Sequence, residues 1–282
     1  MKERKLMLLA LLVTMMLPMN MFAQKDDFGM WFTVGAEKKI NTKWSVGVEA
    51  EYRTRNKVKT PERWSFGVDG SYKITPWLKA SAGYVLLNDY NEKNTYYDDP
   101  EEDYDVDYDK NGNEILIPYG YTGKVKKASK YWGLRHRVNL SLTGTLKLGR
   151  FDISLRERWQ YTYRPEKTVS SRTKYTYLTD GTLSGTSVDN EQKTYKGKGK
   201  SVLRSRLAVG YDIPNCKVDP HASAEAYNSW SIEKIRYIIG ADWKLNKKHV
   251  FTLDYRYQYL RNDEPNGDPN IHIIALGYKY KF

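Results

Sequence analysis

The chain has 282 residues and a formal net charge of +12, from 46 lysines and arginines against 34 aspartates and glutamates. Its mean hydropathy of −0.72 and the lack of a long apolar stretch exclude membrane-spanning helices, which need ~18 or more apolar residues. An ordinary polar domain would not carry 24 tyrosines and 8 tryptophans. A transmembrane β-barrel fits both facts, because half of each of its strands is polar and hydropathy averages miss it.

The N-terminus has the pattern of a secretory signal. Basic side chains at Lys2, Arg4 and Lys5 precede the short apolar run 6–17, and a small-residue cleavage site follows at Ala23. We therefore expect residues 1–23 to be a signal peptide and residues 24–282 to form the barrel. The single cysteine, Cys216, excludes an intramolecular disulfide framework.

Eleven segments of the mature chain alternate apolar and polar side chains, which is the period of a strand with two different faces. In chain order they cover residues 28–39, 44–53, 64–74, 78–86, 132–142, 151–163, 203–211, 218–228, 235–245, 251–259 and 271–282. Most are long enough to cross a membrane when tilted, and aromatic residues cluster toward their ends. The pattern predicts an all-β fold, a transmembrane antiparallel β-barrel of about 10–12 strands.

The C-terminal segment shows this pattern most clearly. Apolar and aromatic side chains from His272 to Phe282 share one face, whereas Gly277, Lys279 and Lys281 share the other. A wall with lipid outside and water inside calls for this arrangement. We therefore expect the protein in the outer membrane of a Gram-negative bacterium.

Short and long connections alternate along the chain, and the longest are 91–130 and 165–200. In outer-membrane barrels the short turns are periplasmic and the long loops extracellular, so the C-terminus should be periplasmic. Bacterial barrels normally have even strand numbers, and eleven is odd. Two alternatives stay open: segment 28–39 lies inside or caps a ten-stranded barrel, or a twelfth strand has been missed.

Several loose motifs resemble those of the DUF2490 family of uncharacterised outer-membrane β-barrel proteins, over the whole mature chain. They are Asp27-Phe28-Gly29-Met30-Trp31, Glu49-x-Glu51-x-Arg53, His136-Arg137, Arg156-Glu157-Arg158, Pro220-x-x-Ser223-x-Glu225 and Gly277-x-x-Tyr280-x-Phe282. The last motif, with Gly277, Tyr280 and Phe282, also resembles the assembly signal of the barrel-insertion machinery. Ala275 departs from it, because a polar residue is usual there. The resemblance implies a fold and a location but no catalytic residue.

Arginines recur in pairs at a spacing of two, which places both members on the face opposite the apolar one. The expected lumenal charge network is Arg53, Arg55, Arg135, Arg137, Arg156, Arg158, Arg204, Arg206, Glu49, Glu51 and Glu225. One interpretation is an electropositive pore for small anions. The favoured one is an arginine–carboxylate network that fills a narrow barrel.

Glu157 falls on the lipid-facing side, which indicates a bulge or a protein contact.

His221, Ser223 and Glu225 alternate onto one face of their segment. A His-x-Ser pair with a third polar partner resembles the sites of outer-membrane phospholipases and lipid A deacylases, in which a base activates a serine nucleophile. These three residues are the candidates for an alternative function as an acyl hydrolase. Their expected lumenal position counts against it, because such enzymes act on lipid at the outer surface, so a role other than an enzyme is favoured.

The connection 91–130 is rich in acidic residues, with Asp107, Asp109 and Asn111 before Gly112. This spacing resembles the start of a calcium loop, but Pro118 stands where the final glutamate would be, and a solvated acidic loop is favoured. No cofactor and no metal are expected. The basic charge lacks any nucleic-acid-binding motif. The expected partners of a monomeric protein are outer-membrane lipid, the barrel-assembly machinery and, if the lumen is open, small anions.

Overall fold

The computed structural model describes residues 26–97, 102–261 and 269–282. The expected signal peptide, residues 1–23, lies outside the described residues. Two compact units can be distinguished: one contains the chain up to Asn88 together with Arg135–Tyr163 and Gly199–Phe282, and the other contains Asp89–Leu134 and Arg164–Lys198. The first unit is the barrel. No helix of the described residues is long and apolar enough to cross a bilayer.

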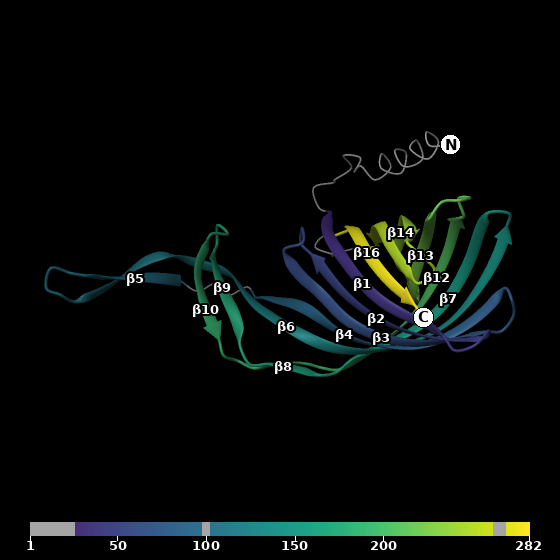
Figure 1. Ribbon diagram of the computed structural model, residues 1–282. Helices are drawn as coiled ribbons and strands as arrows, with labels where there is room; N and C mark the ends of the chain where they lie inside the picture. Colours follow the sequence, from purple (N-terminus) through teal and green to yellow (C-terminus); the bar gives the residue numbers. More distant parts are fainter. Residues whose placement is uncertain (1–25, 98–101, 262–268) are drawn as a thin grey trace, which may run out of the picture. The chain divides into compact units, whose positions relative to one another are not determined.

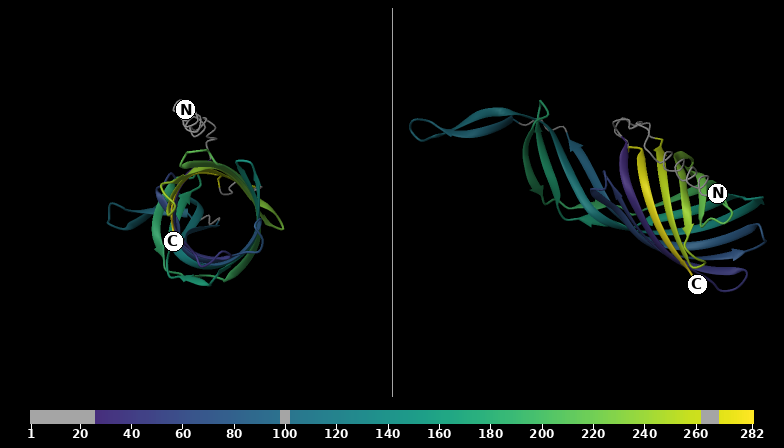
Figure 2. Two further views of the ribbon diagram at one scale, coloured as in Figure 1. Left: turned by 45° about the vertical axis from the view of Figure 1, so that its right-hand side comes forward. Right: turned by 45° about the horizontal axis from the view of Figure 1, so that its top comes forward.

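Eleven strands close into a single ring, which Figure 2 shows from one end in its left view. They are β1 (Asp27–Lys39), β2 (Trp44–Arg55), β3 (Thr60–Lys73), β4 (Leu78–Tyr97), β6 (Glu114–Leu148), β7 (Phe151–Arg164), β12 (Lys198–Tyr211), β13 (Val218–Ser229), β14 (Ser231–Lys244), β15 (His249–Leu260) and β16 (Ile271–Lys281). Each strand pairs with its neighbour in this order, β4 pairs with β6, β7 pairs with β12, and β1 pairs with β16. The prediction of a transmembrane β-barrel is confirmed.

The odd strand number is accommodated by one parallel pair. β1 runs parallel to β16, from Asp27 opposite Ile271 to Glu37 opposite Lys281. Antiparallel alternation around a closed ring requires an even number of strands, so a ring of eleven must contain a parallel junction. Both alternatives for the odd count were therefore wrong: the first segment is a wall strand, and no twelfth strand belongs to the ring among the described residues.

Tight turns join the strands at the end of the barrel where β16 finishes, which we call the turn end; the opposite end is the loop end. The side chain of Asn41 accepts hydrogen bonds from the backbone N–H groups of Lys43 and Trp44, and Asn246 does the same in the turn between β14 and β15. Such Asx turns let the chain reverse within a few residues. Gly149 supplies the positive φ of +60° needed between β6 and β7.

The outer face of the barrel is apolar. Large side chains such as Val48, Phe66, Leu142 and Leu155 are exposed, at 44%, 51%, 52% and 54%. Aromatic contacts at the turn end include Trp44–Tyr72, Trp243–Phe251, Phe251–Tyr278 and Tyr280–Phe282. A continuous exposed apolar surface of this kind is stable only in lipid, and aromatic bands mark the membrane interface.

The two long connections, expected as loops, largely form strands of the second unit (Figure 1). β4 and β6 continue into it, and four further strands pair there, together with the hairpin strand β5 (Glu102–Tyr108). The four are β8 (Lys167–Val169), β9 (Arg172–Leu178), β10 (Leu183–Asp189) and β11 (Lys193–Tyr195). Sequence alternation missed them because both faces of these strands carry polar side chains, which leaves no period-two polarity signal.

Ion pairs and ring stacking hold the second unit together. The side chain of Arg172, only 2% exposed, contacts Asp189 at 2.9 Å and Glu191 at 2.6 Å, and Lys127 contacts Asp189 at 3.0 Å. Tyr195 stacks on Tyr131 with ring centroids 5.2 Å apart. The hydrogen bond from the Asp189 carboxylate raises the pKa of Lys127 above its usual value. This pair therefore stays charged throughout the neutral range.

The parallel junction predicts a specific cross-link. Phe32 faces Leu276 across β1 and β16, and both side chains are exposed on the outer face. With Cys216 changed to serine, a Phe32→Cys, Leu276→Cys variant should form an intramolecular cross-link with a short bismaleimide, detected as a mobility shift on a denaturing gel. The matched variant Phe32→Cys, Tyr280→Cys, displaced by four residues, should not. Equal cross-linking of both variants would contradict the register.

Candidate functional site: the arginine layer of the lumen

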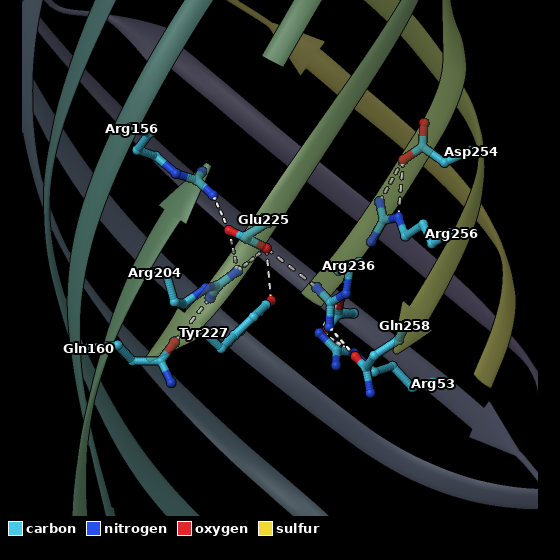
Figure 3. Close-up of polar contacts among 11 residues, drawn as sticks. Arg53, Arg156, Gln160, Arg204, Glu225, Tyr227, Arg236, Asp254, Arg256 and Gln258 are labelled. Carbon is cyan, nitrogen blue, oxygen red and sulfur yellow. Dashed lines mark hydrogen bonds and ion pairs between the residues drawn. The ribbon is translucent and has the colours of Figure 1, made fainter. Parts of the chain in front are cut away.

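Glu225 on β13 is the centre of a cluster of charges inside the barrel (Figure 3). Its side chain is 3% exposed and lies 2.7 Å from Arg156 on β7, 3.0 Å from Arg204 on β12 and 3.7 Å from Arg236 on β14. The hydroxyl of Tyr227, two residues along the same strand, donates a further hydrogen bond at 2.8 Å. Guanidinium groups from three strands thus converge on one carboxylate.

Trp31 on β1 is the second centre of this layer. The side chain is buried, at 2% exposure, and three guanidinium carbons lie over its ring: Arg53 at 3.7 Å, Arg236 at 4.7 Å and Arg256 at 5.1 Å from the centroid. The negative face of an indole attracts cations. Glu51 binds Arg53 through both carboxylate oxygens, at 2.7 and 3.0 Å. Trp31 therefore stabilises three guanidinium groups through cation–π contacts, in addition to the carboxylates nearby.

The carboxylate of Asp254 on β15 links this layer to His221. One oxygen lies 3.0 Å from His221 Nε2, and the other accepts hydrogen bonds from Arg256 at 2.7 and 3.2 Å. Gly240 faces Asp254 across β14 and β15, and a Cβ atom at this position would overlap the carboxylate. The glycine therefore gives Asp254 room to reach both partners.

A cavity of about 1020 Å³ lies against the arginine layer. Among the described residues, eight arginines, four lysines and ten carboxylates line it, and it reaches the turn end at residues such as Lys147, Tyr211 and Lys279. Tyr227, Lys234 and Gln258 lie on the loop-end side of the layer, and they do not line the cavity. The layer formed by Trp31, Glu225 and their arginines therefore bounds this cavity on its loop-end side.

The expected lumenal residues divide into those that line the cavity and those that do not. Arg53, Arg137, Arg156, Arg158, Arg204, Arg206, Glu49, Glu51 and Glu225 line it. Arg55 and Arg135 are not among its lining residues. Three residues of the layer were not among those expected in the lumenal charge network: Trp31, Arg236 and Arg256. Arg236 and Arg256 are solitary on their strands, so a search for arginine pairs passes over them, although the alternation of their strands places them on the inner face.

Glu157 on the lipid-facing side has a polar partner from the neighbouring strand. The register between β6 and β7 is continuous from His136 opposite Tyr163 to Leu148 opposite Phe151. The carboxylate of Glu157 accepts a hydrogen bond of 2.7 Å from Ser205 on β12. Of the two expected explanations, a bulge or a protein contact, the structure shows the contact, and the polar partner comes from the barrel's own wall.

The candidate catalytic residues do not form a dyad. His221 is bound to Asp254, and Ser223 Oγ is buried without a hydrogen-bond partner among the described residues. Glu225 is engaged by arginines and Tyr227. The serine therefore has no base to take its proton, and the geometry gives the acyl-hydrolase alternative no support.

Asp109 and Asn111 belong to the turn between β5 and β6. The Asp109 carboxylate accepts hydrogen bonds from the backbone N–H groups of Asn111 and Asn113 and from the Asn113 side chain. The bond from the Asn113 backbone is the main reason that the pKa of Asp109 is below its usual value. The side chain of Asp107 lies outside the described part. No group of three or more metal-binding side chains occurs among the described residues.

Three comparisons relate the chain to known proteins. The model of the family DUF2490, described as a protein of unknown function, matches residues 28–268. The crystal structure of the β-domain of the Bordetella autotransporter BrkA has a TM-score of 0.47 and 13% identity, covering 85% of this chain and 83% of that chain. The CymD monoaromatic hydrocarbon channel has a TM-score of 0.34 and 8% identity, covering 83% and 82%. No curated protein matches the sequence.

The central role of Glu225 predicts a large effect of its removal. Glu225→Gln leaves the charges of Arg156, Arg204 and Arg236 without their shared carboxylate, and breaking a buried ion pair costs about 3–5 kcal/mol. Urea unfolding of the protein in detergent, followed by heat-modifiable gel mobility, should show this loss. Asp152→Asn is the control, because the Asp152 side chain is 50% exposed and its pair with Lys147 contributes at most ~1 kcal/mol. Equal losses for both variants would rule out Glu225 as the centre of the layer.

Proposed function

Because this chain belongs to the DUF2490 family, whose description assigns no function, its role has to follow from its own lumen, and we propose that it is an outer-membrane barrel with a closed or very narrow, anion-leaning interior. The observation that carries this proposal is the arginine layer around Glu225 and Trp31, beyond which the cavity does not extend. Its role is structural, or it is a narrow channel for small anions.

Placement in the outer membrane is supported by the apolar outer face and the aromatic contacts at the turn end. In this placement the turn end is periplasmic and the loop end faces the outside, and residues 1–23 are a signal peptide that is removed after Ala23. Outer-membrane lipid covers the wall, and the protein is a monomer.

The preference for anions is supported by the composition of the cavity. The described lining residues include twelve lysines and arginines against ten carboxylates. An excess of fixed positive charge in a confined, water-filled space raises the local concentration of anions. The excess is small overall, so the selectivity should be moderate.

The C-terminal strand supports a contact with the barrel-assembly machinery. Tyr280 packs against the ring of His249, and Phe282, 67% exposed, stacks edge-on against Tyr280. The backbone N–H of Phe282 donates a hydrogen bond to the carbonyl of Glu37 on β1. Gly277 lies opposite Thr252 on β15. The terminal aromatic side chains are thus available on the outside of the wall.

Removal of Phe282 should reduce assembly strongly. Its loss takes away the terminal aromatic side chain and one bond of the β1–β16 junction, so little heat-modifiable protein should reach the outer-membrane fraction. Lys110→Gln, in the exposed turn after β5, should assemble like the wild type. Equal yields would mean that the C-terminus is not the recognition element, and recovery of the wild type in the soluble periplasm would contradict the proposed location.

The state of the lumen can be tested by conductance in planar bilayers. The wild-type protein should conduct weakly or not at all. Trp31→Ala removes the ring that holds Arg53, Arg236 and Arg256 together, so it should increase the conductance and keep the preference for anions. Trp77→Ala, at an outer position that is 60% exposed, should change neither property.

A charge reversal separates a charged pathway from a leak. In the Trp31→Ala background, Arg158→Glu should shift the reversal potential toward cations. A large, well-defined single-channel conductance of the wild type would overturn the closed lumen.

A further inference from the structure

Four arginines line the lumen on two adjacent strands, and two of them contact the same carboxylate. Arg156 and Arg158 lie on β7, and Arg204 and Arg206 lie on β12, its neighbour in the ring. All four line the cavity. Among the described residues, Arg156 and Arg204 contact the carboxylate of Glu225, whereas Arg158 and Arg206 contact no carboxylate. This part of the wall therefore carries a local excess of positive charge, which needs a counter-ion.

Glu225 cannot neutralise all four. One of its oxygens accepts hydrogen bonds from Arg156 at 2.7 Å and Arg204 at 3.0 Å, and the other accepts from Arg204 at 3.0 Å and Tyr227 at 2.8 Å. Arg206 stands directly opposite Glu225 in the register of β12 and β13. It nevertheless makes no ion pair among the described residues, and its Nε atom is buried without a hydrogen-bond partner.

Arg158 is in a similar position. Its Nε donates a hydrogen bond of 2.8 Å to Ser141 Oγ on β6, and within the described part of the chain it has no carboxylate partner. The other acidic groups of the layer are engaged elsewhere: Asp254 binds His221 and Arg256, and Glu51 binds Arg53. Glu49 lies on β2, between β1 and β3, and not beside β7 or β12. Arg158 and Arg206 thus have no carboxylate partner among the described residues.

Room for a ligand exists beside Arg156 and Arg206. Ala208 and Gly210 follow Arg206 on the inner face of β12, Ser154 precedes Arg156 on β7, and all three line the cavity. These small side chains leave space on the turn-end side of the guanidinium groups. A solute that enters from the turn end therefore reaches the arginines before it meets the closed layer.

We propose that Arg158 and Arg206, with Arg156 beside them, form a binding site for a small dianionic oxyanion, such as phosphate or the phosphoryl group of a small organic phosphate. Guanidinium groups present paired N–H donors that match the oxygens of phosphate and carboxylate groups. The doubly charged ion neutralises the two arginines that Glu225 leaves over. This site adds a ligand class to the proposed function. It rests on that proposal only because the site requires the folded barrel with this lumen.

The test is isothermal titration calorimetry of the folded, full-length protein in detergent, at constant ionic strength, with inorganic phosphate as the probe and chloride as the reference. The wild type should bind one phosphate saturably. Arg206→Gln and Arg158→Gln should each weaken the affinity about tenfold or more, the effect expected when a charge-assisted hydrogen bond to the ligand is lost. Arg206→Lys keeps the charge but not the paired donors, so its loss should be smaller.

Lys147→Gln is the matched control, because Lys147 lines the same cavity but its side chain is 78% exposed at the turn end. It should leave the affinity unchanged, and heat-modifiable mobility verifies that every variant is folded. A second titration, with glycerol phosphate, compares an organic phosphate with the free ion. We expect glycerol phosphate to bind more tightly. Tighter binding of either compound supports the site and identifies which of the two it prefers.

No saturable binding by the folded wild type, or an equal loss in Lys147→Gln and Arg206→Gln, would overturn the proposal. Because binding is measured without conductance, the two proposals can fail separately. A wild type that conducts strongly but binds phosphate contradicts only the closed lumen, and one that neither conducts nor binds contradicts only the anion site.

Discussion

Inside a bilayer, every backbone N–H and C=O group must find a partner within the protein, because lipid offers none. A sheet satisfies this requirement only by closing on itself, and the whole architecture follows from that closure. Eleven strands form the ring, so β1 and β16 must run parallel where they meet. The outward-facing positions then become apolar, and the inward-facing positions, next to water, become polar.

The narrowness of the ring concentrates the charges of the inward-facing side chains. Arginines from β2, β7, β12, β14 and β15 meet in one layer, and Glu225 and the ring of Trp31 are what they share. Glu225 contacts Arg156, Arg204 and Arg236, and the Trp31 ring contacts Arg53, Arg236 and Arg256. Together the two centres contact most arginines of the layer. The positive charge left over on β7 and β12 lies on the side of the layer that faces the cavity. The charged layer across the lumen and the surplus of arginines beside it are therefore two results of the same arrangement.

Much of the barrel could be predicted from the sequence, because alternation is a local property: the segments around Trp44, Phe251 and Tyr278 each reveal both faces by themselves. The partner of the first strand could not be predicted, since pairing between β1 and β16 depends on the count of all the other strands. The strands of the second unit, such as β9 and β10, escaped because neither face is consistently apolar. In the layer, Glu225 was expected to face the lumen, but Arg236 and Trp31 gain their roles only from neighbours on other strands.

The parallel junction between β1 and β16 also affects the order in which the strands pair during folding. It joins Asp27 to Ile271, two residues from opposite ends of the described barrel, whereas β6 and β7 meet through a two-residue turn. Pairing of distant segments carries the largest loop-closure cost and comes late in folding. Until β16 has been made, β1 keeps one edge without a partner, and the protein is an open sheet with an exposed apolar face. The ring thus closes only when β16 pairs with β1, and until then the sheet has two edges whose backbone N–H and C=O groups have no partner.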